Sequence, residues 1–245
     1  MPSCVRSVSV KRQANCTFFI SSWDSSSSTR AVRASEAAFR HSRRRRAVSR
    51  AFYIASTGRP GPVVLDLAKD AQVGLVDYEY EKVNYIRSYQ PEPDIKQERI
   101  EAAAALINSA KKPFCLVGQG VILGGAEEEL KAFLEKNDIP AGSTVLGLSA
   151  LPSDFPLHKG MLGMHGTKTA NLSLMESDLL IVVGSRFSDR VAANPKTFAQ
   201  NAKIIQIDID EAEINKNVAV DISLIGDVRK VLTVLNQRLD SLSHT

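Results

Sequence analysis

The strongest constraint on the fold is a series of apolar runs separated by stretches with helical character. Residues 179–183 are five consecutive aliphatic residues, 114–117 are a similar apolar run, and 203–209 hold four isoleucines. A strand that is apolar along its whole length must be covered on both faces, which is typical of a parallel sheet with helices on each side. The pattern therefore predicts an α/β fold with a doubly wound parallel sheet.

The other elements of this fold are expected between residues 95 and 240. The periodicity predicts helices over 95–109, 126–137, 167–176 and 227–239, and further strands over 139–145 and 221–225. Upstream, a short helix is expected over 47–55 and a buried strand over 62–67. We divide this part of the chain into 47–75, a linker over 76–94, and the sheet domain over 95–240.

Residues 1–46 differ from the rest in composition. Residues 1–50 hold twelve Ser, and their ten Arg and one Lys against Asp24 and Glu36 give a net charge of +9. The remaining residues carry 20 basic and 25 acidic side chains, so the basic character is confined to this end. Three interpretations are open: a disordered basic tail, an organelle transit peptide, or a non-native segment from a shifted reading frame. We favour the third, for a reason given below.

Several classes of protein are excluded or disfavoured. No apolar run reaches the roughly 18 residues of a membrane helix. Cys4, Cys16 and Cys115 are too scattered for a disulfide framework or a zinc site, which fits a reducing compartment. His158 and His165 have no metal-ligand pattern around them, so we expect no metal site. Only the charge of the first segment would suggest nucleic-acid binding, and we expect none.

Ligands of such sheets bind beyond the carboxyl ends of the strands, where several loops of this chain are unusual. Residues 118–125 place four glycines after a predicted strand, where glycines let backbone N–H groups approach a pyrophosphate closely. Their spacing, G-x-G-x-x-x-G, differs from the dinucleotide pattern G-x-G-x-x-G, so a plain tight turn is the alternative. Residues 161–166 suit an aromatic ring system or a core turn with a hydrogen-bonded His165.

Two further features complete this set of loops. Arg186 and Arg190 could clamp phosphates or form a salt-bridged loop with Asp189. Asp208 and Asp227 follow strands, where an acid can accept ribose hydroxyls. No nucleophile–base set is evident, so these loops predict a domain that holds a large dinucleotide.

At these same loops the chain strongly resembles the catalytic large subunit of acetolactate synthase, a thiamine-diphosphate-dependent enzyme. The matching segments are 55–63, 161–166, 186–191, 207–210 and 213–218, and the resemblance runs from about residue 46 to 240. It implies that 47–75 is a C-terminal remnant of the pyrimidine-binding domain and that 95–240 is the Rossmann-like central FAD domain. Because the resemblance starts in the middle of a domain, we favour a non-native origin for 1–46.

The resemblance also implies which residues act. The catalytic glutamate of the family lies before the matched region and its Gly-Asp-Gly…Asn segment for Mg²⁺ and thiamine diphosphate lies after it, so no catalytic residue is expected here. Lys69, Met164, Asp189 and Arg190 match positions of the substrate channel. The residues expected to contact FAD are Arg59, Gly118, Gln119, Gly120, Thr144, Val145, Leu146, Leu162, Gly163, Met164, His165, Gly166, Gly184, Ser185, Arg186, Asp189, Arg190, Val191, Asp208, Ile209, Gly226, Asp227 and Val228.

The implied reaction joins pyruvate-derived hydroxyethyl-thiamine diphosphate to a second 2-oxo acid, pyruvate or 2-oxobutyrate, in branched-chain amino-acid biosynthesis. The family implies a homodimer or tetramer, a regulatory small subunit, and a cytoplasmic, plastid or mitochondrial location. We expect this chain alone to be inactive, to hold mainly the FAD site and to expose apolar surface around Phe52, Tyr53 and Leu65. The alternatives are a free-standing flavin- or nucleotide-binding module and a related enzyme such as glyoxylate carboligase or oxalyl-CoA decarboxylase.

Overall fold

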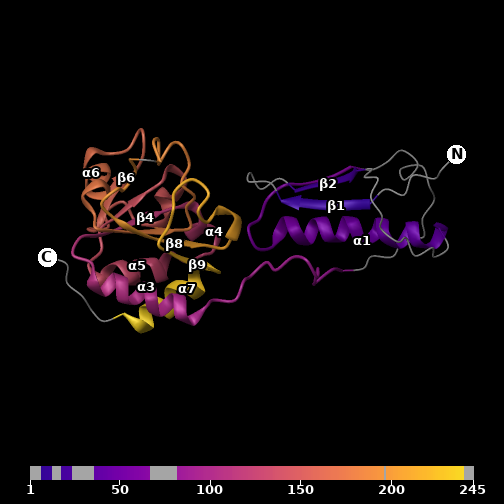
Figure 1. Ribbon diagram of the computed structural model, residues 1–245, viewed down its shortest axis with the longest axis horizontal. Helices are drawn as coiled ribbons and strands as arrows, with labels where there is room; N and C mark the ends of the chain where they lie inside the picture. Colours follow the sequence, from indigo (N-terminus) through magenta and orange to yellow (C-terminus); the bar gives the residue numbers. More distant parts are fainter. Residues whose placement is uncertain (1–6, 13–17, 24–35, 67–81, 196, 240–245) are drawn as a thin grey trace. The chain divides into compact units, whose positions relative to one another are not determined.

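The computed structural model describes residues 7–12, 18–23, 36–66, 82–195 and 197–239, with side chains from Arg46 onward (Figure 1). The chain divides into two compact units, Met1–Pro91 and Glu92–Thr245, which are described separately below.

The described residues of the first unit form three strands and a helix. β1 (Ser7–Arg12) pairs antiparallel with β2 (Phe18–Trp23), and β3 (Val63–Leu65) pairs parallel with β2. The helix α1 (Glu36–Ser56) begins well before the predicted start at residue 47. The strands β1 and β2 were not predicted, because their alternation of apolar and polar residues lasts for only a few positions.

A strand lies within residues 62–67 as predicted, but the prediction that it is buried is wrong. β3 covers Val63–Leu65 and lies at the edge of its sheet, with Val64 45% exposed. The expected apolar surface is present at Phe52, which is 72% exposed, and at Val64 beside Leu65. Tyr53 and Leu65 are half-buried, and the ring of Tyr53 packs edge-on against Tyr89 with centroids 6.0 Å apart. Local apolar character therefore did not decide which of these side chains is covered.

The second unit is built on a six-stranded sheet whose paired strands all run parallel, in the order β6-β5-β4-β7-β8-β9. From β4 the chain adds β5 and β6 on one side, and then β7, β8 and β9 on the other. The order therefore reverses between β4 and β7, and this reversal confirms the predicted doubly wound α/β fold. The strands are β4 (Pro113–Val117), β5 (Ala141–Ser143), β6 (His158–Met161), β7 (Leu179–Val183), β8 (Lys203–Asp208) and β9 (Ile222–Ile225).

Helices cover both faces of this sheet. In Figure 1, α3, α5 and α7 gather on one face and α6 lies on the other. None of the helices that the structure describes is long and apolar enough to cross a membrane. The helices are α3 (Gln97–Ser109), α4 (Gln119–Leu123), α5 (Glu127–Asn137), α6 (Lys168–Glu176) and α7 (Val228–Arg238), with 3₁₀ turns η1 (Val145–Ala150) and η2 (Glu211–Glu213).

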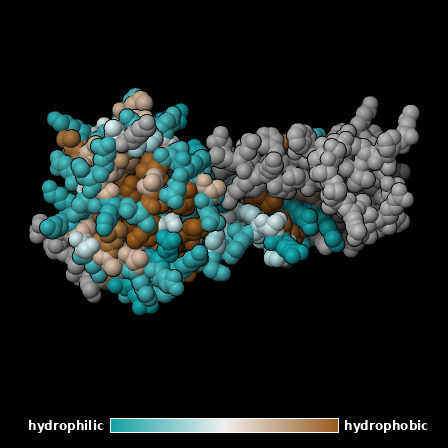
Figure 2. Space-filling view, viewed as in Figure 1, coloured by the Kyte–Doolittle hydropathy of each residue, from teal (hydrophilic) through white to brown (hydrophobic). Residues whose placement is uncertain are grey.

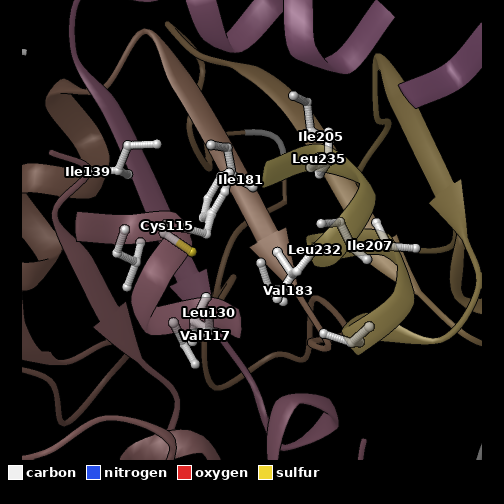
Figure 3. Packing of buried hydrophobic residues seen from close by; sticks show 14 of the residues in the cluster. Cys115, Val117, Leu130, Ile139, Ile181, Val183, Ile205, Ile207, Leu232 and Leu235 are labelled. Atoms are coloured by element: carbon white, nitrogen blue, oxygen red, sulfur yellow. The ribbon is translucent and has the colours of Figure 1, made fainter. Parts of the chain in front are cut away.

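The central strands are apolar throughout because their side chains enter two cores. Along β4, Cys115 and Val117 join the core under α3, α5 and α7, whereas Phe114 and Leu116 join the core under α6. Figure 3 shows the first core, where β4, β7 and β8 face Leu130 of α5 and the α7 leucines. Burial of this kind contributes roughly 1.5–3 kcal/mol for each large aliphatic side chain, so these two layers hold the loops at the strand ends in place.

Three elements of the second unit depart from the sequence prediction. The strand expected over 139–145 is confined to Ala141–Ser143, since the chain turns into η1 at Val145. β6 was not predicted, because a short strand containing His158 and Lys159 has no apolar pattern. The helix α4 lies inside the segment that was predicted as a glycine-rich loop.

Candidate functional site at the carboxyl edge of the sheet

Because the six strands are parallel, their carboxyl ends meet at one edge of the sheet, and each is followed by a loop with predicted site residues. The structure thus brings together residues from six separate segments. Arg59 lies in the first unit and Lys69 lies outside the described residues, so this edge as described includes neither of them. The loop positions are Gly118–Gly120, Thr144–Leu146, Leu162–Gly166, Gly184–Val191, Asp208–Ile209 and Gly226–Val228.

The loops after β4 and β7 cross at the reversal point of the sheet with almost no space between their backbones. Gly118 N–H donates to Val183 at 2.9 Å, and Gly120 N–H donates to Gly184 at 2.9 Å. A Cβ on Gly120 would lie 2.6 Å from Gly184 Cα, and a Cβ on Gly118 would lie 2.3 Å from Gly184 O. Only glycine fits this crossing, which leaves a side-chain-free cradle of backbone at the start of α4.

Apolar side chains border this cradle. The turn η1 packs close to it, because a Cβ on Gly147 would lie 2.5 Å from Val117 O. Val145 and Leu146 of η1 are each 63% exposed, and Met164 in the loop after β6 is 68% exposed. Apolar surface of the second unit is visible in the space-filling view among hydrophilic side chains (Figure 2). These exposed side chains can therefore cover a flat apolar group beside the crossing.

The loop after β6 is fixed by an amide side chain that sequence reasoning missed. Asn171 of α6 accepts from Gly163 N–H and donates to Gly163 O, both at 3.0 Å. Gly163 has φ +104°, and a Cβ there would lie 2.4 Å from Arg190 O. The next residue, Met164, donates its N–H to the same oxygen at 3.0 Å. The loops after β6 and β7 are thus joined directly.

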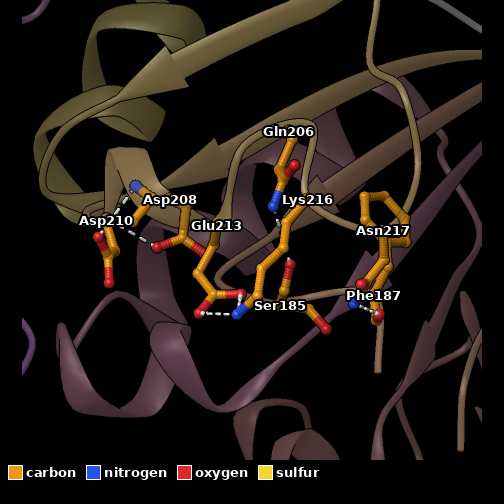
Figure 4. A network of polar contacts seen from close by, with 9 residues as sticks. Ser185, Phe187, Gln206, Asp208, Asp210, Glu213, Lys216 and Asn217 are labelled. Atoms are coloured by element: carbon orange, nitrogen blue, oxygen red, sulfur yellow. Dashed lines mark hydrogen bonds and ion pairs between the residues drawn. The ribbon is translucent and has the colours of Figure 1, made fainter. Parts of the chain in front are cut away.

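Two further amide side chains donate hydrogen bonds to carbonyl groups of the loop after β7 (Figure 4). Asn217 Nδ2 donates to Phe187 O at 2.5 Å, and buried Gln206 donates to Ser185 O at 3.4 Å. Between these anchored carbonyls, the side chain of Arg186 is exposed. The alternative of a salt-bridged loop is present only at the surface, since Arg190 lies 3.7 Å from Asp189 with both side chains at least 80% exposed.

The acidic residues after β8 and β9 organise local backbone. Asp208 Oδ1 accepts from Asp210 N–H at 2.9 Å, and Asp227 Oδ1 accepts from Lys230 N–H at 3.0 Å at the start of α7. Buried Glu213 is paired with Lys216 Nζ at 3.1 Å (Figure 4). These contacts shape both strand ends, and the predicted ribose contacts of Asp208 and Asp227 stay predictions.

The two histidines of this region have different surroundings. His158 is half-buried, with Nε2 3.0 Å from Ser143 Oγ, and burial lowers its pKa. His165 is exposed in the loop after β6, so it is not the core histidine that one interpretation of this loop required. Among the residues that the structure describes, no three His, Cys, Asp or Glu side chains are grouped so that they could hold a metal ion.

Taken together, the edge presents a side-chain-free backbone crossing, exposed guanidinium groups and exposed apolar side chains. Guanidinium groups are suited to phosphate, and apolar side chains are suited to an aromatic ring.

Comparison with known proteins identifies relatives of this arrangement. A probable acetolactate synthase large subunit from Methanococcus aeolicus is 48% identical to this chain over 194 residues. The acetolactate synthase large subunit of Corynebacterium glutamicum is 47% identical over 189 residues. These alignments cover 78% and 77% of this chain but only 32% and 30% of the relatives. The acetolactate synthase isozyme 2 large subunit of Escherichia coli is 41% identical, with 80% of this chain and 35% of that protein covered. The chain therefore spans about a third of the length of these relatives.

Structural comparison points the same way. A structure of a putative thiamin diphosphate-dependent enzyme from Mycobacterium smegmatis matches 81% of this chain and 37% of its own, with a TM-score of 0.65 and 26% identity. The family model described as thiamine pyrophosphate enzyme, central domain, matches residues 100–235, more than half of the chain. The chain thus belongs to the thiamine pyrophosphate enzyme family through its central domain, and it is a homologue of acetolactate synthase large subunits.

Proposed function

We propose that the second unit binds FAD across the carboxyl edge of its sheet. The observation that carries this proposal is the crossing of Gly118, Gly120 and Gly184, where side-chain-free backbone meets the start of a helix. The N–H groups of these three glycines already donate to Val183 O, Gly184 O and Ile207 O, so what the crossing offers a pyrophosphate is close approach to a backbone without side chains. The fit to FAD is supported by the agreement between these loops and the positions that the acetolactate synthase resemblance implies.

The remaining loops supply the other contacts of this proposal. Arg186 pairs with phosphate oxygens, while Val145, Leu146 and Met164 cover the isoalloxazine ring with apolar surface. Asp208 and Asp227 lie where the ribose or ribityl hydroxyls need acceptors. In this family, the flavin takes no net part in the oxidation balance of the reaction and mainly shapes the active site.

The proposal is tested by titrating the full chain with FAD and following the quenching of flavin fluorescence. Arg186→Gln removes an exposed guanidinium from the carboxyl edge without disturbing either core. Charged hydrogen bonds contribute about 1.5–3 kcal/mol, so its FAD affinity should fall about 10- to 100-fold. The matched control is Arg238→Gln at the far end of α7, which makes the same charge change away from this edge and should bind as wild type. Absence of saturable binding by the wild-type chain would refute the proposal.

We further propose that the chain functions as part of an acetolactate synthase-type enzyme. In that enzyme, thiamine diphosphate and Mg²⁺ supply the carbanion chemistry and pyruvate or 2-oxobutyrate are the substrates. The proposal includes a homodimer or tetramer with a regulatory small subunit, and residues 47–75 as part of a pyrimidine-binding domain. It is supported by identities of 41–48% to acetolactate synthase large subunits.

The 245 residues contain no Gly-Asp-Gly segment and no predicted catalytic glutamate, so we expect the chain alone to form no acetolactate. The measurement is acetolactate formation from pyruvate by the purified chain with thiamine diphosphate, Mg²⁺ and FAD. A rate above the protein-free background would overturn this expectation. An absence of acetolactate together with tight FAD binding would instead match the proposed division of roles.

A further inference from the structure

We infer that Asn171 is a positioning residue for the flavin: it holds the loop after β6 in the conformation that covers the isoalloxazine ring. This inference rests on the proposed FAD site. Its starting point is the pair of 3.0 Å hydrogen bonds that join the Asn171 side chain to both the N–H and the carbonyl of Gly163.

The Asn171 side chain bonds to Gly163 in the way that the backbone of a neighbouring strand would. Its amide group donates and accepts as a peptide group of a neighbouring strand would, and it does so at a residue whose own conformation is unusual. Gly163 has φ +104°, and its missing side chain leaves room for Arg190 O at the position a Cβ would need. A turn with this backbone conformation has no regular ladder to hold it, so the amide side chain supplies the two bonds that a ladder would supply.

The loop that Asn171 fixes is bonded directly to the loop after β7. Met164 N–H donates to Arg190 O at 3.0 Å, so fixing Gly163 also fixes the separation between Met164 and Arg190. The β7 loop has its own anchor in Asn217, which binds Phe187 O at 2.5 Å. Asn171 therefore fixes the loop after β6, Asn217 fixes the loop after β7, and the hydrogen bond from Met164 N–H to Arg190 O joins the two loops.

The location of Asn171 separates this role from general support of the fold. It lies in the first turns of α6, is only half-buried, and belongs to neither apolar core. The N-cap of α6 is made by Thr167, whose Oγ1 accepts from Ala170 N–H at 3.2 Å, so α6 keeps its start when Asn171 is changed. Loss of the Asn171 bonds should therefore loosen one loop and leave the sheet and helices intact.

The experiment compares Asn171→Leu and Asn171→Asp with Thr169→Ala, a change at an exposed position of the same helix. Leucine removes both hydrogen bonds at similar volume, whereas aspartate keeps the acceptor for Gly163 N–H but sets a carboxylate oxygen against Gly163 O. Two neutral hydrogen bonds correspond to about a 10-fold loss of FAD affinity in Asn171→Leu, with a loss at least as large in Asn171→Asp and none in Thr169→Ala.

Binding of ADP, which lacks the flavin ring, separates positioning from loosening of the whole site. Because the glycine crossing is intact in every variant, the affinity for ADP should stay at the wild-type value while FAD affinity and flavin fluorescence quenching fall. Equal losses for ADP and FAD, or wild-type FAD affinity in Asn171→Leu despite lower thermal stability, would overturn the inference and leave the FAD site standing. A wild-type chain that binds no FAD would refute the proposed function and, with it, this inference.

Discussion

Replacing Gly184 by alanine tests the crossing at the centre of the sheet most severely. The added Cβ would lie 2.6 Å from Gly120 Cα and 2.8 Å from Val121 N, both backbone atoms that no rotamer change can move. The backbone of Gly184 also has φ +58°, a left-handed conformation. That conformation costs alanine about 1–2 kcal/mol, and overpacking of this kind costs about 1–3 kcal/mol. We therefore expect Gly184→Ala to lower the free energy of unfolding by about 2–5 kcal/mol.

Cys115 provides a local readout of this change. It is fully buried in the same sheet, and burial raises the pKa of its thiol, so it reacts with an alkylating agent only when this unit opens. A loss of about 2 kcal/mol raises the open population about 30-fold. Alkylation of the Cys115 peptide, followed by mass spectrometry, should accelerate at least about 30-fold in Gly184→Ala.

The matched control for this experiment is Gly124→Ala. Gly124 has φ −85°, an ordinary helical value, and a Cβ there would meet only Gly120 O closely, at 3.1 Å. Its effect should stay within about 1 kcal/mol, or about 5-fold in labelling rate. Equal labelling rates in Gly184→Ala and wild type would refute the argument that only glycine fits at the crossing.

Three further predictions follow from contacts around the sheet. Asp178→Ala removes the carboxylate that accepts from Lys111 N–H at 2.8 Å and Lys112 N–H at 2.9 Å, and should lower the free energy of unfolding by about 1–3 kcal/mol in urea titration, with exposed Asp154→Ala unchanged. Lys136→Met removes the ammonium that binds Asn236 O and Leu239 O, so amide exchange at the end of α7 should speed up while that of α3 stays constant. Burial lowers the pKa of His158 in the folded state below the ordinary histidine value of 6.5. As pH drops through 6.5 the unfolded state therefore binds more protons than the folded state, and the free energy of unfolding should fall. His158→Gln should flatten that slope in denaturation curves at several pH values, and an unchanged slope would contradict the assignment.

Much of the second unit could be predicted because its signals are local. The five consecutive aliphatic residues of β7 and the apolar run of β4 are buried only if both faces of the sheet are covered. The alternation of helices and strands along the chain then predicts parallel pairing. The same reasoning predicts that these loops share one edge of the sheet, and the structure brings them together there; that a ligand binds at this edge stays a prediction.

The parts that could not be predicted depend on contacts between distant segments. β6 is a strand because β5 lies beside it, and its residues His158 and Lys159 carry no apolar pattern. The bonds of Asn171 to Gly163 and of Asn217 to Phe187 join segments that meet only after the sheet has formed. In the first unit, Val64 is exposed while Val63 and Leu65 are half-buried, because successive side chains of a strand point to opposite faces of the sheet. The sequence of β3 does not reveal which of its faces is covered.

The central claim, that the carboxyl edge of the sheet is a flavin dinucleotide site, is tested most directly by amide hydrogen exchange of the full chain with and without FAD. Protection should be confined to peptides that contain residues 118–120, 144–146, 162–166, 184–191, 208–209 and 226–228. Loops at the opposite edge, such as 110–112 and 138–140, should exchange equally in both states. Protection at that opposite edge, or no protection in the presence of saturating FAD, would contradict the account.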